Sequence, residues 1–262
     1  MYKIYFSLLV FLLVELFFTC NTAFANNAFY VTLSNQMARK RQLEVVSNNA
    51  ANVSSVGYEQ EEVIFRKVDT KQNSKRKNSF VWAETTYKNG EKGSLKTTNR
   101  PTDLAIGGDG YFKLITPRGA RYTLDGSMFI NSQNILVNTM GYPYANREGE
   151  PIEIPDNFQS IDISEDGTVF IDDEEISRIG VFVFANNNDP LIKEGNSMYK
   201  SSSEAIAIED YTIISGALRE SNVNPTLVMA KMVEAQRSVG ITNNLMSELS
   251  DLDRSVINKL SK

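Results

Sequence analysis

The chain has 262 residues, with 27 Lys and Arg, 32 Asp and Glu, no His and one Cys. The absence of histidine excludes Ser-His-Asp and Cys-His arrangements, histidine-bound zinc and imidazole acid–base catalysis. The lone Cys20 excludes internal disulfides, thiolate zinc sites and iron–sulfur clusters. A net charge of −5 is untypical of a general nucleic-acid binder. We therefore expect a folded protein with no metal, little catalytic equipment and no nucleic-acid partner.

The first 25 residues form a signal-like hydrophobic extension. A short basic start is followed by an apolar run over residues 4–18, and residues 22–25 include the small residues that a signal peptidase reads. A helix over this run is about 22 Å long, which is too short for a hydrocarbon core of roughly 30 Å. Two interpretations stay open for residues 1–25, a secretory signal and a mis-assigned translation start.

Residues 26–57 are predicted to form an N-terminal helix. Apolar side chains recur there mostly at three- and four-residue steps, at Phe29, Leu33, Met37, Leu43, Val46, Ala50 and Val53. Gly57 is expected to end the helix, because glycine accepts the positive φ that commonly closes one. The next segment is dense in charge and has no sustained period, so we expect a charged, solvated linker over residues 58–80.

Residues 81–212 are predicted to form an antiparallel β-rich domain. Short runs of β-branched and aromatic residues cover residues 111–115, 128–130, 135–137, 161–163, 169–171 and 181–184. Glycine-containing turns separate these runs, for example at Asp125-Gly126 and after Asp109 at Gly110. Turns at this spacing favour a sandwich or barrel-like arrangement over βαβ units.

One turn in this domain also has the residue spacing of a calcium-binding loop. The matching residues are Asp162, Ser164, Asp166, Gly167 and Asp173. An EF-hand needs a bidentate glutamate at the last position and helices on both sides, whereas the flanks here alternate like strands. The sequence therefore favours a β-hairpin that turns at Asp166-Gly167.

The last segment, residues 213–262, is predicted to contain a long helix. Asn224 is expected to be its N-cap and Pro225 its first residue. A 4-3 spacing typical of a coiled-coil seam runs through Val228, Met232, Ala235, Val239, Thr242, Met246, Leu249, Asp253, Val256 and Leu260. Leu245, Leu252 and Ile257 widen this seam, and Gly240 is its weak point. We therefore expect an α+β fold, in which long N- and C-terminal helices form a coiled-coil-like assembly domain around a central antiparallel β-rich domain.

Four segments, in order, resemble signatures of the flagellar basal-body rod and hook protein family. They are residues 47–58, residues 100–112, residues 121–127 followed by 141–143, and residues 215–225 with 234–237. Residues 27–31 and 149–155 are most similar to the proximal-rod members of that family, and the distal-rod members are close. The second segment contains Asp103, and the fourth contains Asn222 and Gln236.

This resemblance implies a structural subunit of the axial rod, located in the basal body where the rod crosses the periplasm as a drive shaft for motility. It implies a protein that is not an enzyme and has no cofactor and no small-molecule substrate. It implies export by the flagellar type III apparatus, and packing against other copies of the chain and other rod proteins. The terminal helices would then build the inner rod domain, with the β-domain outside them. Two alternatives come from other classes. One is a signal-cleaved secreted or periplasmic β-rich binding protein or hydrolase, and the other is a surface adhesin-like module.

The residues predicted to matter have assembly or structural roles. The side-chain amides of Asn48, Asn49 and Asn52 lie where they can bind backbone groups at a helix end or across a subunit contact. Gln236 is placed to bridge neighbouring copies. The full set is Asn48, Asn49, Asn52, Gly57, Asp103, Gly110, Asp125, Gly126, Asn222, Asn224, Pro225, Gln236, Leu249 and Leu252.

Overall fold

The structure is a computed structural model that describes residues 28–73, 76–88, 91–184 and 191–260, and it divides into two compact units. The helix unit contains the described residues up to 50, residues 61–88 and residues from 225 onward. The β unit contains residues 51–60 and the described part of residues 89–224. The predicted signal-like extension lies outside the described residues.

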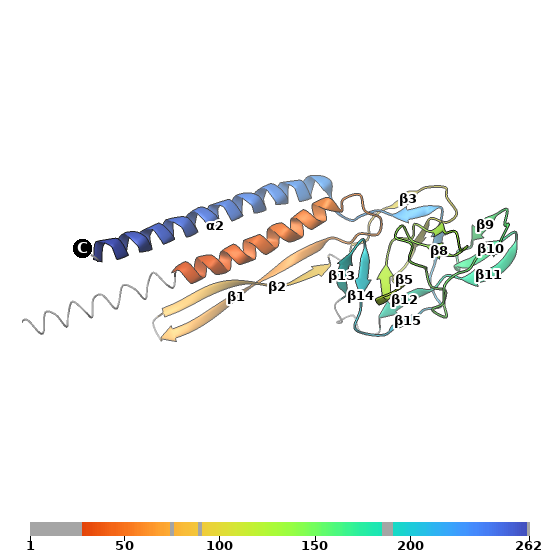
Figure 1. Cartoon of the computed structure of the whole chain (residues 1–262), viewed down its shortest axis with the longest axis horizontal. Coiled ribbons are helices and arrows are strands. Elements are labelled where there is room, and N and C mark those ends of the chain that lie inside the picture. The colour runs from red at the N-terminus through yellow and green to blue at the C-terminus, as the bar shows by residue number, and fades with distance from the viewer. Residues whose placement is uncertain (1–27, 74–75, 89–90, 185–190, 261–262) are drawn as a thin grey trace, which may run out of the picture. The chain divides into compact units, whose positions relative to one another are not determined.

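In its described residues, the helix unit consists of two helices and one long β-hairpin (Figure 1). The N-terminal helix spans residues 28–51, and α2 spans Pro225–Leu260. Strands β1 (Glu61–Asn73) and β2 (Arg76–Lys88) pair antiparallel. The Gln36 amide of the first helix donates to Asn243 of α2 at 2.7 Å, and Lys231 of α2 forms a 3.1 Å ion pair with Glu62 of β1. Within the described residues, no helix is both long and apolar enough to cross a membrane.

The buried face of α2 is the face that the 4-3 spacing predicts. Val228, Ala235 and Thr242 are only 4%, 1% and 5% exposed. In the N-terminal helix the buried face differs from the predicted one: Ala38 and Val45 are buried, whereas Met37, which belongs to the predicted apolar face, is 60% exposed. Side chains at three- and four-residue steps share one face of a helix, so the spacing was enough to select the buried side of α2, although Val256 near its end is 51% exposed. The structure therefore confirms the α+β class with one helix near each end of the chain.

The β unit is built entirely from antiparallel pairs in the part of the chain that the structure describes. Its largest sheet has the order β13-β14-β6-β5-β12-β15, and β11-β10-β9 form a three-stranded sheet. Three two-stranded pairs, β16-β4, β17-β3 and β7-β8, complete the unit. The strands are β3 (Leu95–Thr97), β4 (Leu104–Ile106), β5 (Tyr111–Thr116), β6 (Gly119–Thr123), β7 (Phe129–Ile130), β8 (Leu136–Val137), β9 (Ile161–Ile163), β10 (Thr168–Ile171), β11 (Glu174–Arg178), β12 (Val181–Phe184), β13 (Ile192–Gly195), β14 (Met198–Lys200), β15 (Ala205–Ala207), β16 (Ile213–Ser215) and β17 (Ala217–Arg219).

One main hydrophobic core holds these small sheets together. Leu104, Leu114, Met128, Leu136 and Tyr144 are completely buried in it. The phenol of Tyr144 donates to the Asp125 carbonyl at 2.8 Å, so the hydroxyl of this buried ring keeps a hydrogen-bond partner. The core therefore joins strands from the first half of the β unit to the turn at Asp125-Gly126.

Two expected boundaries differ from the structure. The first helix ends at residue 51 rather than 57, and Gly57 lies in a turn. Residues 58–80, expected to be a charged linker, contain β1 and the start of β2 instead. Several large side chains on these strands remain exposed, among them Ile64, Phe65 and Trp82, so neither face has the regular apolar alternation by which a strand is recognised in sequence.

Candidate assembly interface

Asn49 ties the first helix to the start of the hairpin inside the helix unit. Its Nδ2 donates to the Glu61 carbonyl at 2.8 Å, and its Oδ1 accepts from the Glu61 backbone N–H at 3.1 Å. The side chain thus pairs with both backbone groups of one residue, as a neighbouring strand would. Asn49 is 3% exposed, so these bonds satisfy a buried amide.

In the β unit, the segment that follows the first helix is held by the chain just before α2. The Gly57 N–H donates to the Arg219 carbonyl at 2.8 Å. Asn222 makes three contacts: its N–H donates to the Tyr58 carbonyl, its Oδ1 accepts from the Gln60 N–H at 2.6 Å, and its Nδ2 donates to the Glu91 carbonyl. Asn222 therefore joins two distant stretches of sequence.

Strands β13 and β14 hold the same segment. The Ser197 hydroxyl donates to the Val56 carbonyl at 3.0 Å, and the Lys193 ammonium donates to the Glu59 carbonyl at 3.1 Å. The same ammonium lies 3.4 Å from the centre of the Tyr58 ring. A cation over an aromatic face is attracted by the ring quadrupole, and Tyr58 is almost fully buried here.

Gly57 packs directly on the backbone of the central hairpin of the β unit. Its φ is +65°, and a Cβ added to it would lie 2.4 Å from the Leu124 carbonyl carbon and 2.5 Å from the Asp125 nitrogen. Gly126 approaches another strand as closely, since a Cβ there would lie 1.9 Å from the Leu104 oxygen. No other residue type fits either contact without a backbone shift.

A pair of carboxylates lies beside this glycine contact. Asp103 is 4% exposed and forms an ion pair with Arg100. Asp125 accepts from the Ser127 N–H at 2.9 Å. Burial raises the pKa of the Asp125 carboxyl, and the nearby negative charge of Asp103 adds to that rise.

Arg219 is a buried cation that the set of predicted residues does not include. It is 7% exposed, and its guanidinium donates to the carbonyls of Gly93 and Ile106. Burial lowers its pKa. Lys193, Ser197 and Tyr58 were also missed, because their contacts join residues far apart in sequence. The sequence offered one indication of their importance: Tyr58 and Arg219 lie in the signature segments.

The four signature segments therefore meet at one place in the β unit. The Gly57 N–H donates to the Arg219 carbonyl, which links the first segment to the fourth, and the Leu104 N–H donates to the Gly126 carbonyl at 3.0 Å. The Ala217 N–H donates to the Asp103 carbonyl at 3.2 Å, which links the second segment to the fourth. We call this set of contacts the junction cluster. It brings together Gly57, Asp103, Asp125, Gly126 and Asn222 of the predicted residues.

The remaining predicted residues are spread over the two units. Asn52 accepts from the Ser55 hydroxyl at 3.0 Å, and Gly110 lies beside Val181 at the start of β5. Asn48 is exposed on the first helix, and Gln236 is exposed on α2. Asn224 and Pro225 occupy the expected positions, the last residue before α2 and its first residue. Leu249 is half-buried, whereas Leu252 is 60% exposed.

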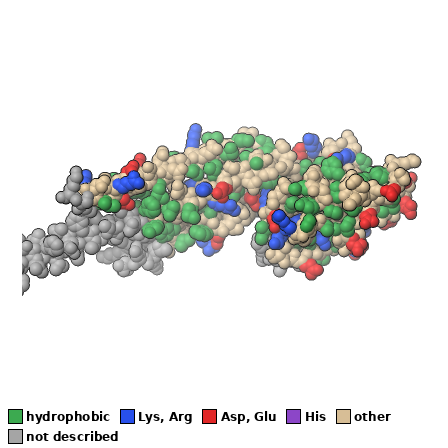
Figure 2. Space-filling model, viewed as in Figure 1, with side chains coloured by type: hydrophobic (Ala, Val, Ile, Leu, Met, Phe, Trp, Pro, Cys, Tyr) green, Lys and Arg blue, Asp and Glu red, His purple; other side chains and the backbone are tan. Residues whose placement is uncertain are grey.

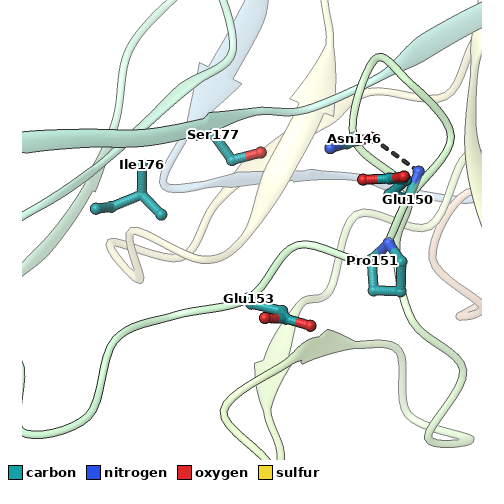
Figure 3. A pocket seen from close by; sticks show the side chains of 6 residues that line it. All are labelled: Asn146, Glu150, Pro151, Glu153, Ile176 and Ser177. Carbon is teal, nitrogen blue, oxygen red and sulfur yellow. Dashed lines mark hydrogen bonds between the residues drawn. The ribbon is translucent and has the colours of Figure 1, made fainter.

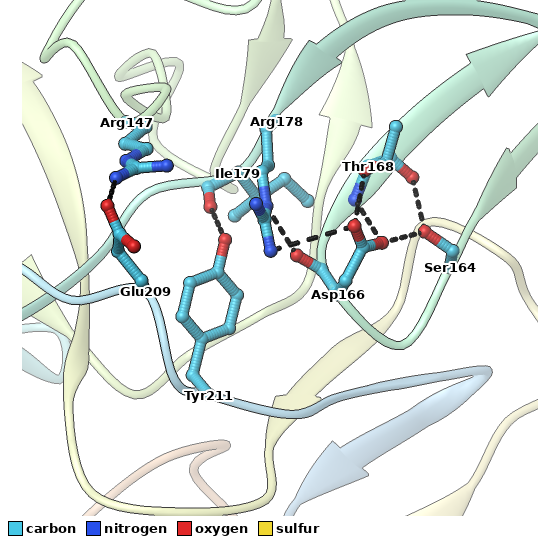
Figure 4. Close-up of polar contacts among 8 residues, drawn as sticks. All are labelled: Arg147, Ser164, Asp166, Thr168, Arg178, Ile179, Glu209 and Tyr211. Carbon is cyan, nitrogen blue, oxygen red and sulfur yellow. Dashed lines mark hydrogen bonds and ion pairs between the residues drawn. The ribbon is translucent and has the colours of Figure 1, made fainter.

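The turn with calcium-loop spacing is a hairpin between β9 and β10 (Figure 4). Asp166 accepts from the hydroxyls of Ser164 and Thr168 and lies 3.6 Å from Arg178. These hydrogen bonds, with a smaller contribution from Arg178, lower the pKa of Asp166 to about 2. Strands flank the turn on both sides, so the structure confirms the hairpin interpretation.

A shallow cavity of about 530 Å³ lies elsewhere on the β unit (Figure 3). Its lining includes two carboxylates, Glu150 and Glu153, and one amide, Asn146. The Asn146 Oδ1 already accepts from the Glu150 N–H at 2.8 Å. The lining also contains the hydroxyl of Ser177, and none of the hydrogen bonds of the described residues joins it to either carboxylate.

Comparison with known proteins places this geometry in a family. The model for the flagellar hook protein FlgE/F/G D1 domain matches residues 105–171, and the model for the flagellar basal body rod FlgEFG protein C-terminal region matches residues 214–260. The flagellar basal-body rod protein FlgF of Caulobacter vibrioides is 31% identical over 90% of this chain and 99% of its own length. The chain belongs to the flagellar basal-body rod protein family.

Two further relatives agree with this membership. The FlgF protein of Mesorhizobium japonicum is 31% identical over 89% of the chain and 98% of its own length, and the FlgG protein of Bacillus subtilis is 29% identical over 88% and 98%. The chain is thus a non-enzymatic structural subunit of the basal-body rod, similar to FlgF, and it assembles with other basal-body rod proteins. This finding favours the rod function over the secreted binding protein or hydrolase.

Proposed function

We propose that this rod subunit assembles with copies of itself and with neighbouring rod proteins through coiled-coil-like packing of its two terminal helices. The observation that carries the proposal is the exposed apolar surface of α2. Five large side chains in its second half, Ile241, Leu245, Leu252, Val256 and Ile257, are 69%, 46%, 60%, 51% and 65% exposed. Val256 belongs to the predicted seam, and the other four residues lie beside the part of the seam that is buried within the unit.

The physical argument is the cost of leaving this surface in water. Burying apolar surface contributes about 25 cal/mol per Å², so covering several half-exposed leucine and isoleucine side chains stabilises an assembly by several kcal/mol. In a monomer these exposed side chains stay in water, so they contribute no free energy of burial. Contiguous exposed apolar surface of this kind marks a contact site in proteins that otherwise keep polar surfaces.

The proposal also covers the place of the subunit in the rod and the route by which it is exported. The two helices, residues 28–51 and Pro225–Leu260, would belong to the inner domain of the rod, and the β unit would be a separate domain. Similarity to proteins named FlgF supports a place in the proximal rod. Export would follow the flagellar type III route.

The experiment compares Leu252→Asp with Ser247→Asp in the source bacterium. Both positions are exposed on α2, but only Leu252 belongs to the apolar surface. We expect Leu252→Asp to remove the protein from purified hook–basal bodies, measured by peptide mass spectrometry, and to abolish swimming. Ser247→Asp should leave both unchanged. Normal incorporation of Leu252→Asp would refute the proposed role of this surface.

A further inference from the structure

The β unit contains three aspartates that precede a glycine, in the pairs Asp109-Gly110, Asp125-Gly126 and Asp166-Gly167. In such a pair the glycine nitrogen can approach the side-chain carboxyl carbon, because glycine has no side chain in the way. Figure 2 shows acidic side chains on the surface of this unit, but only these three aspartates of the chain precede a glycine. The glycine is buried in all three pairs, so the surroundings of the carboxylate distinguish them.

Asp125-Gly126 is closed by packing. The Asp125 carboxylate accepts from the Ser127 N–H at 2.9 Å. A Cβ added to Gly126 would lie 1.9 Å from the Leu104 oxygen, so the backbone here has no room to rearrange into a ring. Burial raises the pKa of the Asp125 carboxyl, which favours the more reactive protonated acid, so the protection of this pair comes from its packing.

Asp166-Gly167 is held by hydrogen bonds. The Asp166 carboxylate accepts from the hydroxyls of Ser164 and Thr168. The Gly167 N–H donates to the Ser164 carbonyl at 3.0 Å. These bonds must break before the nitrogen reaches the carboxyl carbon, so this pair reacts only when the turn opens locally.

Asp109-Gly110 has neither restraint. The Asp109 side chain is 90% exposed, and its partner is the ammonium of Lys92 at 2.5 Å. Gly110 lies just before β5, and among the described residues no acceptor receives its N–H. A single exposed ion pair is a weak restraint, because water and salt screen it. The carboxyl carbon and the glycine nitrogen of this pair are therefore the least constrained of the three.

We propose that Asp109-Gly110 is a site of spontaneous isoaspartate formation in the folded protein. The Gly110 nitrogen forms a bond to the side-chain carboxyl carbon of Asp109, the carboxyl hydroxyl and the amide proton leave as water, and a five-membered imide remains. Water then adds to the imide and breaks one of its two carbonyl C–N bonds. When the bond to the backbone carbonyl breaks, the chain runs through the former side chain, with no net change in mass.

Two neighbours determine the rate and the consequence of this reaction. The hydrogen bond from Lys92 and its charge lower the pKa of Asp109, and an ionised carboxylate is a poorer electrophile than the protonated acid, so Lys92 slows the reaction. The product has one more backbone carbon before Gly110. Gly110 lies against Val181, where an added Cβ would be 2.5 Å from the Val181 side chain, so we expect the isomerised chain to be less stable.

Peptide mass spectrometry of the full-length protein, incubated in mildly acidic buffer, tests the site. All chains carry Asn89→Gln, because Asn89-Gly90, which lies outside the described residues, can form the same imide. In the folded protein we expect isoaspartate to form at Asp109 at least about five times faster than at Asp125 or Asp166. In urea the three sites should react at similar rates, because unfolding removes the contacts that distinguish them.

Two variants test the chemistry at this pair. Lys92→Gln should raise the rate at Asp109 by at least about two times, because it removes the charge that keeps the carboxylate ionised. Asp109→Glu should remain unmodified at this position, because glutamate would have to close a six-membered ring, which forms less readily. The isomerised fraction, separated by chromatography, should melt at least about 2 °C below the unmodified fraction.

Three outcomes would overturn the proposal. Equal rates at the three sites of the folded protein would show that the fold does not select Asp109. Faster reaction at Asp125 would show that protonation of a buried acid outweighs exposure. Identical melting of the two fractions would refute the predicted strain at Gly110.

Discussion

The side-chain amide of Asn49 binds both backbone groups of Glu61, with its Nδ2 2.8 Å from the carbonyl oxygen and its Oδ1 3.1 Å from the nitrogen. The contact fixes where the first helix meets the first strand of the hairpin. Both residues belong to the helix unit, in which we place the assembly surface. Asn49 therefore helps to orient the hairpin, together with the ion pair between Glu62 and Lys231 of α2.

We predict that Asn49→Ala destabilises the helix unit by about 1–3 kcal/mol, because it leaves the N–H and carbonyl of Glu61 without these partners at a partly buried site. Ser47→Ala, at an exposed position of the same helix, should change stability by less than about 0.5 kcal/mol. Urea denaturation followed by Trp82 fluorescence measures both. Equal effects of the two variants would contradict the role of the Asn49 contact.

Gly57→Ala should destabilise the junction cluster by more than about 2 kcal/mol. The new Cβ would lie 2.4 Å from the Leu124 backbone, in addition to the strain of a positive φ. Gly141 is the matched control, since it also has a positive φ of +81° but no atom within 4 Å of the added Cβ. Gly141→Ala should cost only about 1 kcal/mol. Thermal unfolding of the two variants distinguishes the backbone clash at Gly57 from the strain of a positive φ, which both variants share. An equal loss of stability in the two variants would contradict the close contact of Gly57 with Leu124.

Asp125→Asn should stabilise the β unit at neutral pH. Burial raises the pKa of Asp125 in the folded state, so the ionised carboxylate lowers stability as pH rises through that folded pKa. Asparagine keeps an oxygen to accept from the Ser127 N–H and carries no charge. The gain in melting temperature should be present at pH 7 and vanish as pH falls below about 3.9, the ordinary value for aspartate. A gain in melting temperature that increases as pH falls would contradict the raised pKa of Asp125.

Gly240→Ala should stabilise α2 by about 1 kcal/mol. Gly240 lies in the middle of the helix, and an added Cβ would meet no atom within 4 Å. Alanine is favoured over glycine in a helix interior by roughly this amount. The circular dichroism signal at helical wavelengths should persist to higher temperature. Destabilisation would show that the position is closely packed.

Local sequence patterns were enough to locate α2 and several strands. Asn224 and Pro225 mark the start of α2, and the 4-3 apolar spacing selects its buried face. The segments 161–163 and 181–184 were predicted with the bounds that β9 and β12 have in the structure. These features depend on contacts between residues a few positions apart, so a short window of sequence contains the information.

The β1–β2 hairpin could be identified only from the tertiary structure. Its strands are charged and partly exposed, so no apolar period separates them from a solvated loop, and only the antiparallel register from Glu61↔Lys88 to Asn73↔Arg76 defines them.

The sequence by itself determined the class of the protein: two terminal helices, a β-rich middle and the signatures of a rod subunit. The tertiary structure alone decided that Gly57 packs on Leu124 and binds Arg219, and that Asn222 closes the same cluster. These contacts join residues that are between 67 and 164 positions apart in the chain. Contacts over such distances depend on how the whole chain closes on itself, and a local pattern does not encode them.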